Sequence, residues 1–266
     1  MIDREISTKE WRILEISDAA HPNEPHVLAI EIEKRTIAQW QSGKNAPIGG
    51  RIDLNAHYLA GDLLHHTHHP RLLGSMGGHY ERADEASILY TMIGGNMLLD
   101  DDARGLRIGS YLHNEVVRWA KEVGLPGRIA TFSLVQQDAG TAEERDRRNR
   151  FYEQFGYEFD WQDPINGIEH ASGRLKDSIT IDMLTAKDVI SGVRAFDLPA
   201  GVHHFAQVMR KSQVATGKAE QRLADARRGY ESDKAGAYGL VSGLKYALYV
   251  AIAIPSIAFL LYAALR

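Results

Sequence analysis

The chain has 266 residues, of which 44% are hydrophobic and 25% are charged, a composition typical of a globular protein with a sizeable core. Its formal net charge of −4 argues against a general nucleic-acid binder, so nucleic acid is not an expected partner. The sequence contains no cysteine, which excludes disulfides, cysteine-ligated zinc and thiol catalysis.

Residues 1–185 have the pattern of a mixed α and β domain. Alternating and β-branched residues predict strands over Trp11–Ser17, Val27–Glu33, Arg51–Leu59 and Ser87–Ile93. Further along, HHTHH places His65 and His69 four residues apart, a feasible metal pair if the segment is helical. Because Pro70 follows at once, we interpret this segment as a polar loop or part of a substrate mouth and expect no metal site.

A basic, glycine-containing turn follows the acidic triplet Asp100–Asp102. From there the apolar residues recur at helical spacing, which predicts a helix from near Arg107 to near Gly124. A helix start offers unpaired backbone N–H groups, glycines allow close approach, and arginines donate charge-assisted hydrogen bonds. The stretch ARGLRIGS is therefore either an anion-binding helix start or a tight turn with surface arginines.

The rest of this domain alternates between strand and helix patterns. A strand is expected over Arg128–Val135, followed by the polar loop QQDAGTAEE. A second helix is expected through RDRRNRFYEQF, ending at Gly156. The last expected elements are a short strand over Tyr157–Trp161 and a hairpin that turns at Ser172-Gly173.

The C-terminal part of the chain has a different composition. Residues 186–243 predict a basic helical stalk and linker, although such a charge run is also typical of a solvated helix face. Within 244–266, the twenty residues from Tyr246 to Leu265 carry no charge, which predicts a transmembrane helix; a buried helix of a soluble domain is the alternative. We expect a single-pass C-terminal anchor in a lipid bilayer, with the preceding domain in the cytoplasm.

Two motifs resemble those of the GNAT family of N-acyltransferases. The turn Arg104-Gly105-Leu106-Arg107-Ile108-Gly109 resembles the acyl-CoA loop RGxGIG of that family, with Arg107 in place of a glycine. The stretch FYEQFGYEF, residues 151–159, resembles the closing motif FYEKLGF. The order of the predicted elements between the two motifs also agrees with the family.

The resemblance implies an α+β fold, the acyl-CoA N-acyltransferase-like fold. In it, a mixed, mostly antiparallel sheet is flanked by helices and splayed between its fourth and fifth strands, where acetyl-CoA binds. The backbone of Leu98 and Leu99 would hold the pantetheine and the acetyl carbonyl. The pyrophosphate would be held by the turn made of Arg104, Gly105, Leu106, Arg107, Ile108, Gly109 and Ser110.

The resemblance also implies a proton donor. Tyr152 occupies the tyrosine of the closing motif and would protonate the departing thiolate, whereas the alternative is core packing beside Phe151 and Phe155. The general base is left open between Glu81, Glu85, Asp100 and water. Relatives often carry an asparagine where this chain has Arg145.

The expected function is that of a membrane-anchored acetyltransferase, which moves an acetyl group from acetyl-CoA to an amine acceptor that the sequence does not identify. The alternative is a non-enzymatic CoA-binding or interaction module tethered to the membrane, which Arg107 and Arg145 favour because they replace family residues. A third, weaker option is a toxin-like acetyltransferase that acts on charged tRNA.

Overall fold

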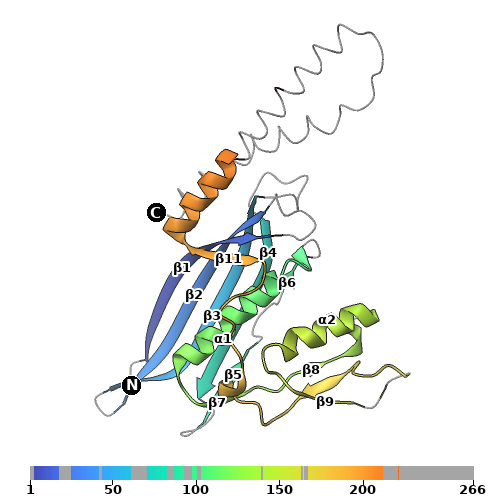
Figure 1. The fold of residues 1–266 in the computed structure, drawn as a ribbon. Coiled ribbons are helices and arrows are strands. Elements are labelled where there is room, and N and C mark those ends of the chain that lie inside the picture. The colour runs from blue at the N-terminus through green and yellow to red at the C-terminus, as the bar shows by residue number, and fades with distance from the viewer. Residues whose placement is uncertain are drawn as a thin grey trace. The chain divides into compact units, whose positions relative to one another are not determined.

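The computed structural model describes residues 3–17, 25–41, 44–60, 71–82, 87–92, 98–100, 103–138, 140–162, 164, 167–211 and 221. These residues form a mixed α+β protein with a large, mostly antiparallel sheet (Figure 1). The chain divides into two compact units. One comprises Met1–Trp11, Ile30–Ala56 and Leu72–Arg194, and the other comprises Arg12–Ala29, His57–Arg71 and Ala195–Arg266.

The large sheet has eight strands in the described part of the chain. Seven follow the order β11-β1-β2-β3-β4-β5-β7, and β6 also pairs with β4. The β4–β5 and β4–β6 pairs are antiparallel, and β5–β7 is parallel. The strands are β1 (Asp3–Ile16), β2 (His26–Gln41), β3 (Lys44–Ala60), β4 (Arg71–Arg82), β5 (Ile88–Thr91), β6 (Leu98–Leu99), β7 (Gly127–Ile129) and β11 (Val193–Asp197).

Helix α1 (Ile108–Val123) packs on the sheet at β4 (Figure 1). A β-carbon at Gly78 would lie 2.8 Å from Cγ1 of Val116, so the helix approaches the strand more closely than any larger residue would allow. The Tyr80 and Trp119 rings are 5.8 Å apart. The helix ends at Gly124, whose φ of 68° is the left-handed conformation of a C-cap.

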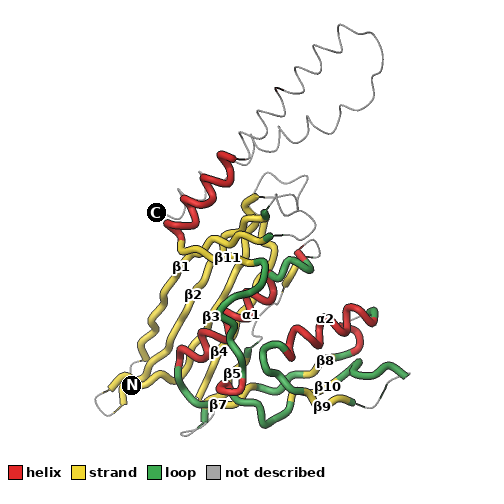
Figure 2. The backbone as a smooth tube through the Cα atoms, in the orientation of Figure 1, coloured by secondary structure: helices red, strands yellow, loops and turns green. Residues whose placement is uncertain are grey.

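A second, three-stranded antiparallel sheet has the order β8-β10-β9 and carries helix α2 (Figure 2). The aromatic rings of Phe132, Tyr152 and Phe159 join the helix to this sheet, with centroids 5.4–5.8 Å apart. The elements are β8 (Ser133–Leu134), α2 (Ala142–Glu153), β9 (Phe159–Trp161) and β10 (Gly173–Leu175), with 3₁₀ turns η2 (Gln136–Asp138) and η3 (Ile181–Met183).

The structure confirms the predicted mixed, mostly antiparallel sheet and the α1 helix, but it corrects several elements. The single strand expected over Arg128–Val135 is two strands, β7 and β8, which belong to different sheets. No hairpin turns at Ser172-Gly173, because Gly173 pairs within β10 with both β8 and β9. Helix α2 begins at Ala142, inside the segment expected to be a loop.

The region expected to be a stalk contains further regular structure. Strand β11 lies at the edge of the large sheet beside β1, and residues 198–211 are helical. Within the second compact unit, His204 of this 198–211 helix contacts Glu15 of β1. The His204 ring also stacks on Phe196, with ring centroids 4.4 Å apart. These contacts fix the first part of the expected stalk to a strand.

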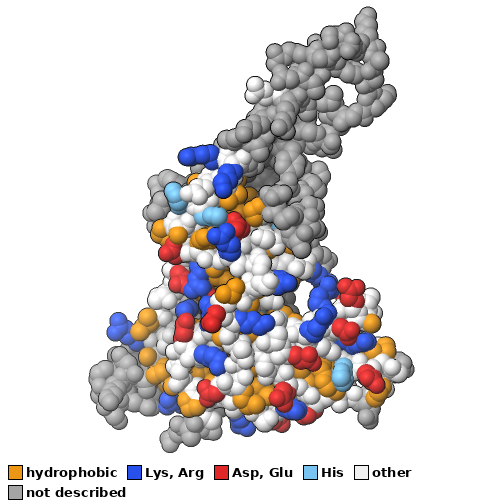
Figure 3. Space-filling view, in the orientation of Figure 1, with side chains coloured by type: hydrophobic (Ala, Val, Ile, Leu, Met, Phe, Trp, Pro, Cys, Tyr) orange, Lys and Arg blue, Asp and Glu red, His pale blue; other side chains and the backbone are white. Residues whose placement is uncertain are grey.

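The predicted span from Tyr246 to Leu265 lies outside the described residues. Within the described ranges, we found no helix that is long and apolar enough to cross a membrane. On the face shown in Figure 3, basic and acidic side chains are interspersed.

Candidate functional site

Two adjacent parallel strands, β5 and β7, are followed along the chain by strands that belong to different sheets. Strand β5 pairs with β7 through the register Ile88↔Gly127, Leu89↔Arg128 and Tyr90↔Ile129. The N–H of Ala130 then donates to the Tyr90 carbonyl at 2.7 Å. Beyond this point β6 stays on β4 in the large sheet, whereas β8 pairs with β10 in the small sheet (Figure 2). The chain thus passes from the large sheet to the small sheet after β7.

The predicted anion-binding turn directly follows β6. The Asp100 N–H donates to the Leu73 carbonyl at 2.7 Å, and the Ala103 N–H donates to the Asp100 carbonyl at 2.9 Å. Gly105 has a φ of 88°, and a β-carbon there would have no atom within 4 Å. Since Arg104 and Gly105 are both exposed, the backbone of this turn is open to solvent.

Helix α1 begins at this turn without a side-chain cap. Its N-cap residue is Arg107, which makes no capping hydrogen bond, and its first turn contains no acidic residue. The first helical bond runs from the Tyr111 N–H to the Arg107 carbonyl at 3.0 Å. The N–H groups of Ile108, Gly109 and Ser110 therefore have no acceptor within the helix, and they lie at the positive end of its dipole.

Gly109 brings the three predicted parts of the site together. A β-carbon at this position would lie 3.8 Å from Cδ2 of Leu99 in β6 and 4.0 Å from Cε2 of Phe151 in α2. The end of β6, the start of α1 and the closing motif are thus neighbours in space. Leu98 pairs with Ser75 and Leu99 with Gly74, which places the backbone of both residues at the edge of β4.

Arg107 adopts a backbone conformation that glycine adopts without strain. Its φ is 62°, in the left-handed region that residues with a side chain rarely adopt. Its exposed guanidinium donates from Nη1 to the Ser191 carbonyl at 3.0 Å. One of the two predicted phosphate-binding guanidinium groups is therefore held by a carbonyl of the chain itself.

Tyr152 lies in an aromatic cluster and is only 6% exposed. Its ring centroid is 5.4 Å from that of Phe132 and 5.8 Å from those of Tyr157 and Phe159. Phe132 belongs to the connection between β7 and β8, so Tyr152 lies beside the segment that links the two sheets. These contacts demonstrate a packing role, and the proton-donor role stays a prediction.

The candidate bases are dispersed. Glu81 lies on β4 and lines a surface cavity, whereas Asp100 is partly buried at the end of β6. Glu85, the pair Asp101–Asp102 and the histidine segment 65–69 lie outside the described residues. Among the residues that the structure describes, no group of three or more His, Asp or Glu side chains could hold a metal ion.

A buried histidine was not singled out from the sequence. His113 of α1 is fully buried, and its Nε2 lies 3.1 Å from the Tyr157 hydroxyl. Burial lowers the pKa of His113 to about 3 and raises the pKa of Tyr157 well above its usual value. Tyr157 occupies the phenylalanine position of the closing motif, and its additional hydroxyl is the sequence signal that a polar partner must lie nearby.

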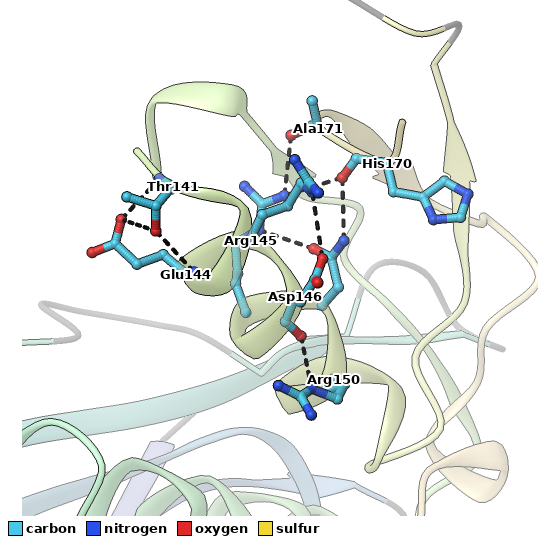
Figure 4. Close-up of polar contacts among 9 residues, drawn as sticks. Thr141, Glu144, Arg145, Asp146, Arg150, His170 and Ala171 are labelled. Carbon is cyan, nitrogen blue, oxygen red and sulfur yellow. Dashed lines mark hydrogen bonds and ion pairs between the residues drawn. The ribbon is translucent and has the colours of Figure 1, made fainter. Parts of the chain in front are cut away.

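The start of α2 is capped by its own side chains (Figure 4). The Glu144 N–H donates to Oγ1 of Thr141 at 3.2 Å, and the Thr141 N–H donates to Oε2 of Glu144 at 3.0 Å. The spacing of Thr141 and Glu144 is the sequence signature of this capping box. Arg145, at the family's asparagine position, lies 3.5 Å from Asp146, and the buried Asn149 donates to the His170 carbonyl at 3.2 Å.

Comparison of the chain with protein-family models, curated proteins and solved structures found no match. The functional interpretation therefore depends on the geometry of the chain itself and on the motifs in its sequence.

Proposed function

We propose that this chain is an acetyltransferase of the GNAT type, which moves an acetyl group from acetyl-CoA to an amine acceptor. The proposal includes the acyl-CoA N-acyltransferase-like fold. The observation that carries it is an uncapped helix start beside β6, in a chain whose strands after β5 and β7 pair in different sheets. Gly109, in the first turn of that helix, lies close to Leu99 of β6 and to Phe151 of the closing motif.

The described residues are suited to binding the pantetheine and pyrophosphate of acetyl-CoA. The backbone of Leu98 and Leu99 would hold the pantetheine amides, because sheet edges pair with extended amide-containing ligands. The N–H groups of Ile108, Gly109 and Ser110 would hold the pyrophosphate, and Arg104 would add charge at the exposed turn. Acetyl-CoA, when bound, supplies an activated thioester.

The reaction requires few groups of the protein. The neutral amine nitrogen attacks the thioester carbonyl carbon, a C–N bond forms, the C–S bond breaks, and the amine proton leaves to a base or to water. Tyr152 is the proposed donor of the proton that the departing thiolate takes up, since a tyrosine hydroxyl is protonated at neutral pH. Its position in the aromatic cluster beside Phe132 holds the ring in place.

We also propose that the chain is anchored to a membrane through Tyr246–Leu265. The twenty uncharged residues match the hydrocarbon thickness of a bilayer, and the basic residues before them favour a cytoplasmic catalytic domain. Retention of the full chain in membranes after alkaline carbonate extraction would support the anchor, and release into the supernatant would contradict it.

Acetyl-CoA binding by the purified full chain tests the function. Acetyl-CoA at about 100 times its dissociation constant should stabilise the folded protein by roughly 2.7 kcal/mol, which thermal denaturation detects. Release of free thiol in the presence of an amine panel then tests turnover. Absence of both stabilisation and calorimetric binding at millimolar acetyl-CoA would contradict the proposal.

A non-enzymatic module tethered to the membrane is the second candidate. The engagement of Arg107 with the Ser191 carbonyl and the burial of Tyr152 favour it, because both groups already have structural roles. Stabilisation by acetyl-CoA without thiol release for any amine would support this candidate over the enzyme.

A further inference from the structure

The described residues of the first unit line a second candidate site, an open surface cavity of about 390 Å³ on the large sheet. It lies where β1, β2, β3 and β4 run side by side. The lining side chains that bear on a ligand are those of Glu5, Arg35, Ile37, Arg51, His79 and Glu81.

The cavity lies mainly on the face of the sheet opposite α1. Side chains alternate along a strand, and Tyr80 of β4 faces the helix, where its ring is 5.8 Å from that of Trp119. Its neighbours His79 and Glu81 therefore point to the other face. A β-carbon at Gly50 would lie 2.5 Å from the Tyr80 ring, so glycine keeps this part of the sheet close-packed beneath the cavity.

The charges around the cavity are unbalanced in favour of a cation. Arg35 lies 2.7 Å from Glu33 and Arg51 lies 2.7 Å from Asp53, so each cationic group is already compensated by a carboxylate of its own strand. The side chains of Glu5 and Glu81 make no hydrogen bond or ion pair with another described residue, although Glu5 lies within electrostatic reach of Arg35. Together with Glu33 and Asp53, four carboxylates thus lie near two guanidinium groups, an excess of negative charge that favours a positively charged ligand.

The cavity also has an apolar wall. Ile37 is 40% exposed at its edge, and Ile48 lies in the adjacent strand. An exposed isoleucine beside two carboxylates suits a ligand with a short hydrocarbon chain between cationic groups. A ligand with one carboxylate of its own would instead meet Glu5 and Glu81 as like charges.

The position of the cavity relates it to the donor site. His79 pairs with Thr91 and Glu81 with Leu89, so the residues of β4 that line it are paired with β5. Strand β5 is in turn the parallel neighbour of β7, after which the chain passes into the small sheet. We infer that this cavity holds the acceptor of the proposed acetyl transfer and that the acceptor is a small aliphatic diamine or polyamine. The inference rests on the proposed function only in naming that ligand the acceptor.

Direct binding tests the inference with the full chain in detergent. Isothermal titration with 1,4-diaminobutane should show binding, with at least about tenfold weaker binding of 1-aminobutane and none of 1,4-butanediol. The isosteric variants Glu5→Gln and Glu81→Gln should each weaken diamine binding about tenfold. Asp160→Asn, which removes an exposed carboxylate of β9 outside the cavity, should leave diamine binding unchanged.

The two proposals fail in different ways. Acetyl-CoA binding without diamine binding, or diamine binding that Glu5→Gln and Glu81→Gln leave unchanged, overturns the acceptor cavity and leaves the proposed function intact. Diamine binding that depends on both carboxylates, in a chain that does not bind acetyl-CoA, supports a cation site but overturns its assignment as acceptor site. Thermal midpoints of the variants within about 2 °C of the parent show that the fold is retained.

Discussion

The two helices of the first unit begin in opposite ways. Helix α2 begins at Thr141, whose side chain and backbone are bonded to Glu144, and its first turn contains two acidic residues. Helix α1 begins at Arg107, which has no capping bond and is followed by a first turn without an acidic residue. One helix start is closed by the chain, and the other is left available to an external anion.

The difference correlates with how each helix is held in place. Helix α1 buries ten residues, whereas α2 buries only Asn149 and Tyr152. Because packing of a buried face stabilises α1, the helix tolerates an uncapped start. Helix α2 has half of its residues exposed and depends more on its cap. An uncapped start is thus compatible with stability where packing is extensive. The uncapped start of α1 is the site at which we propose that the pyrophosphate binds.

Placing an acidic residue in the first turn of α1, as in α2, should produce the largest effect on acetyl-CoA binding. Ser110 occupies the position in α1 that Glu144 occupies in α2, so Ser110→Glu places a carboxylate at the open helix start. At about 4 Å from a phosphate and an effective dielectric of about 20, the repulsion is roughly 4 kcal/mol. We expect acetyl-CoA binding to weaken on the order of 100- to 1,000-fold by calorimetry.

The same substitution should not destabilise the protein. A carboxylate near a helix N-terminus stabilises by about 0.3–1 kcal/mol, so thermal stability should be equal or higher while binding is lost. Ser110→Gln is the neutral control and should retain most of the binding. Equal binding by Ser110→Glu and the parent would show that the anion does not lie at this helix start.

The next largest effect is expected at the far end of α2. Tyr152→Phe removes the proposed proton donor and retains the ring contacts with Phe132 and Phe159. We expect kcat to fall about 100-fold, because positioned acids contribute about 10²–10⁴-fold, and acetyl-CoA affinity to stay unchanged. Unchanged turnover in a thiol-release assay would leave Tyr152 with a packing role alone.

Breaking the cap of α2 should affect stability and leave binding unchanged. Thr141→Ala removes the hydroxyl that accepts from the Glu144 N–H, and the loss of such a cap costs about 1 kcal/mol. Chemical denaturation should show this decrease, with acetyl-CoA binding unaffected. Thr141→Ser retains the hydroxyl and is the matched control. A loss of binding in Thr141→Ala would mean that the two helix starts are not independent.

Two substitutions of Arg107 measure the backbone strain at the start of α1, because both remove the charged side chain and only one relieves the strain. Both Arg107→Ala and Arg107→Gly remove the hydrogen bond to Ser191, but only glycine adopts the φ of 62° without strain. We expect Arg107→Gly to be about 1 kcal/mol more stable than Arg107→Ala by chemical denaturation. Equal stability of the two variants would place this residue in another backbone conformation in solution.

The smallest predicted effect is a pH dependence of the α2 cap. The hydrogen bond from the Thr141 backbone lowers the pKa of Glu144 below its usual 4.5. Because the folded pKa is the lower one, the stabilisation is present above about pH 4.5 and is lost as the pH falls through the folded pKa. The stability difference between the parent and Glu144→Gln should therefore diminish on acidification. A difference that is constant with pH would contradict this assignment.

The sequence was informative where one face of an element is buried. The apolar spacing of α1 and the alternation in β1, β2 and β3 predicted those elements, because the same periodicity determines which side chains enter the core. Strand β4 was not predicted, because Gly74, Gly77 and Gly78 interrupt its pattern. Gly78 is required by the close approach of Val116, a tertiary contact that local sequence does not reveal.

The sequence predicted the segments that form the candidate site, but it did not predict which strands and side chains they contact. The motifs located the turn at Arg104–Ser110 and the helix with Tyr152, and Gly109 does bring these regions together. The division of Arg128–Val135 between two sheets was missed, because an apolar run does not specify which strands it pairs with. His113 was missed for a similar reason, since its partner Tyr157 lies 44 residues further along the chain.

The difference between the two helix starts can be measured residue by residue. Titration of ¹⁵N-labelled full chain with acetyl-CoA should shift the amide resonances of Ile108, Gly109 and Ser110, and leave those of Ala142 and Glu143 at the capped start of α2 in place. Saturable shifts confined to α1 are the result that the proposed donor site predicts. Unchanged resonances at α1, with shifts elsewhere or none at saturating acetyl-CoA, would contradict it.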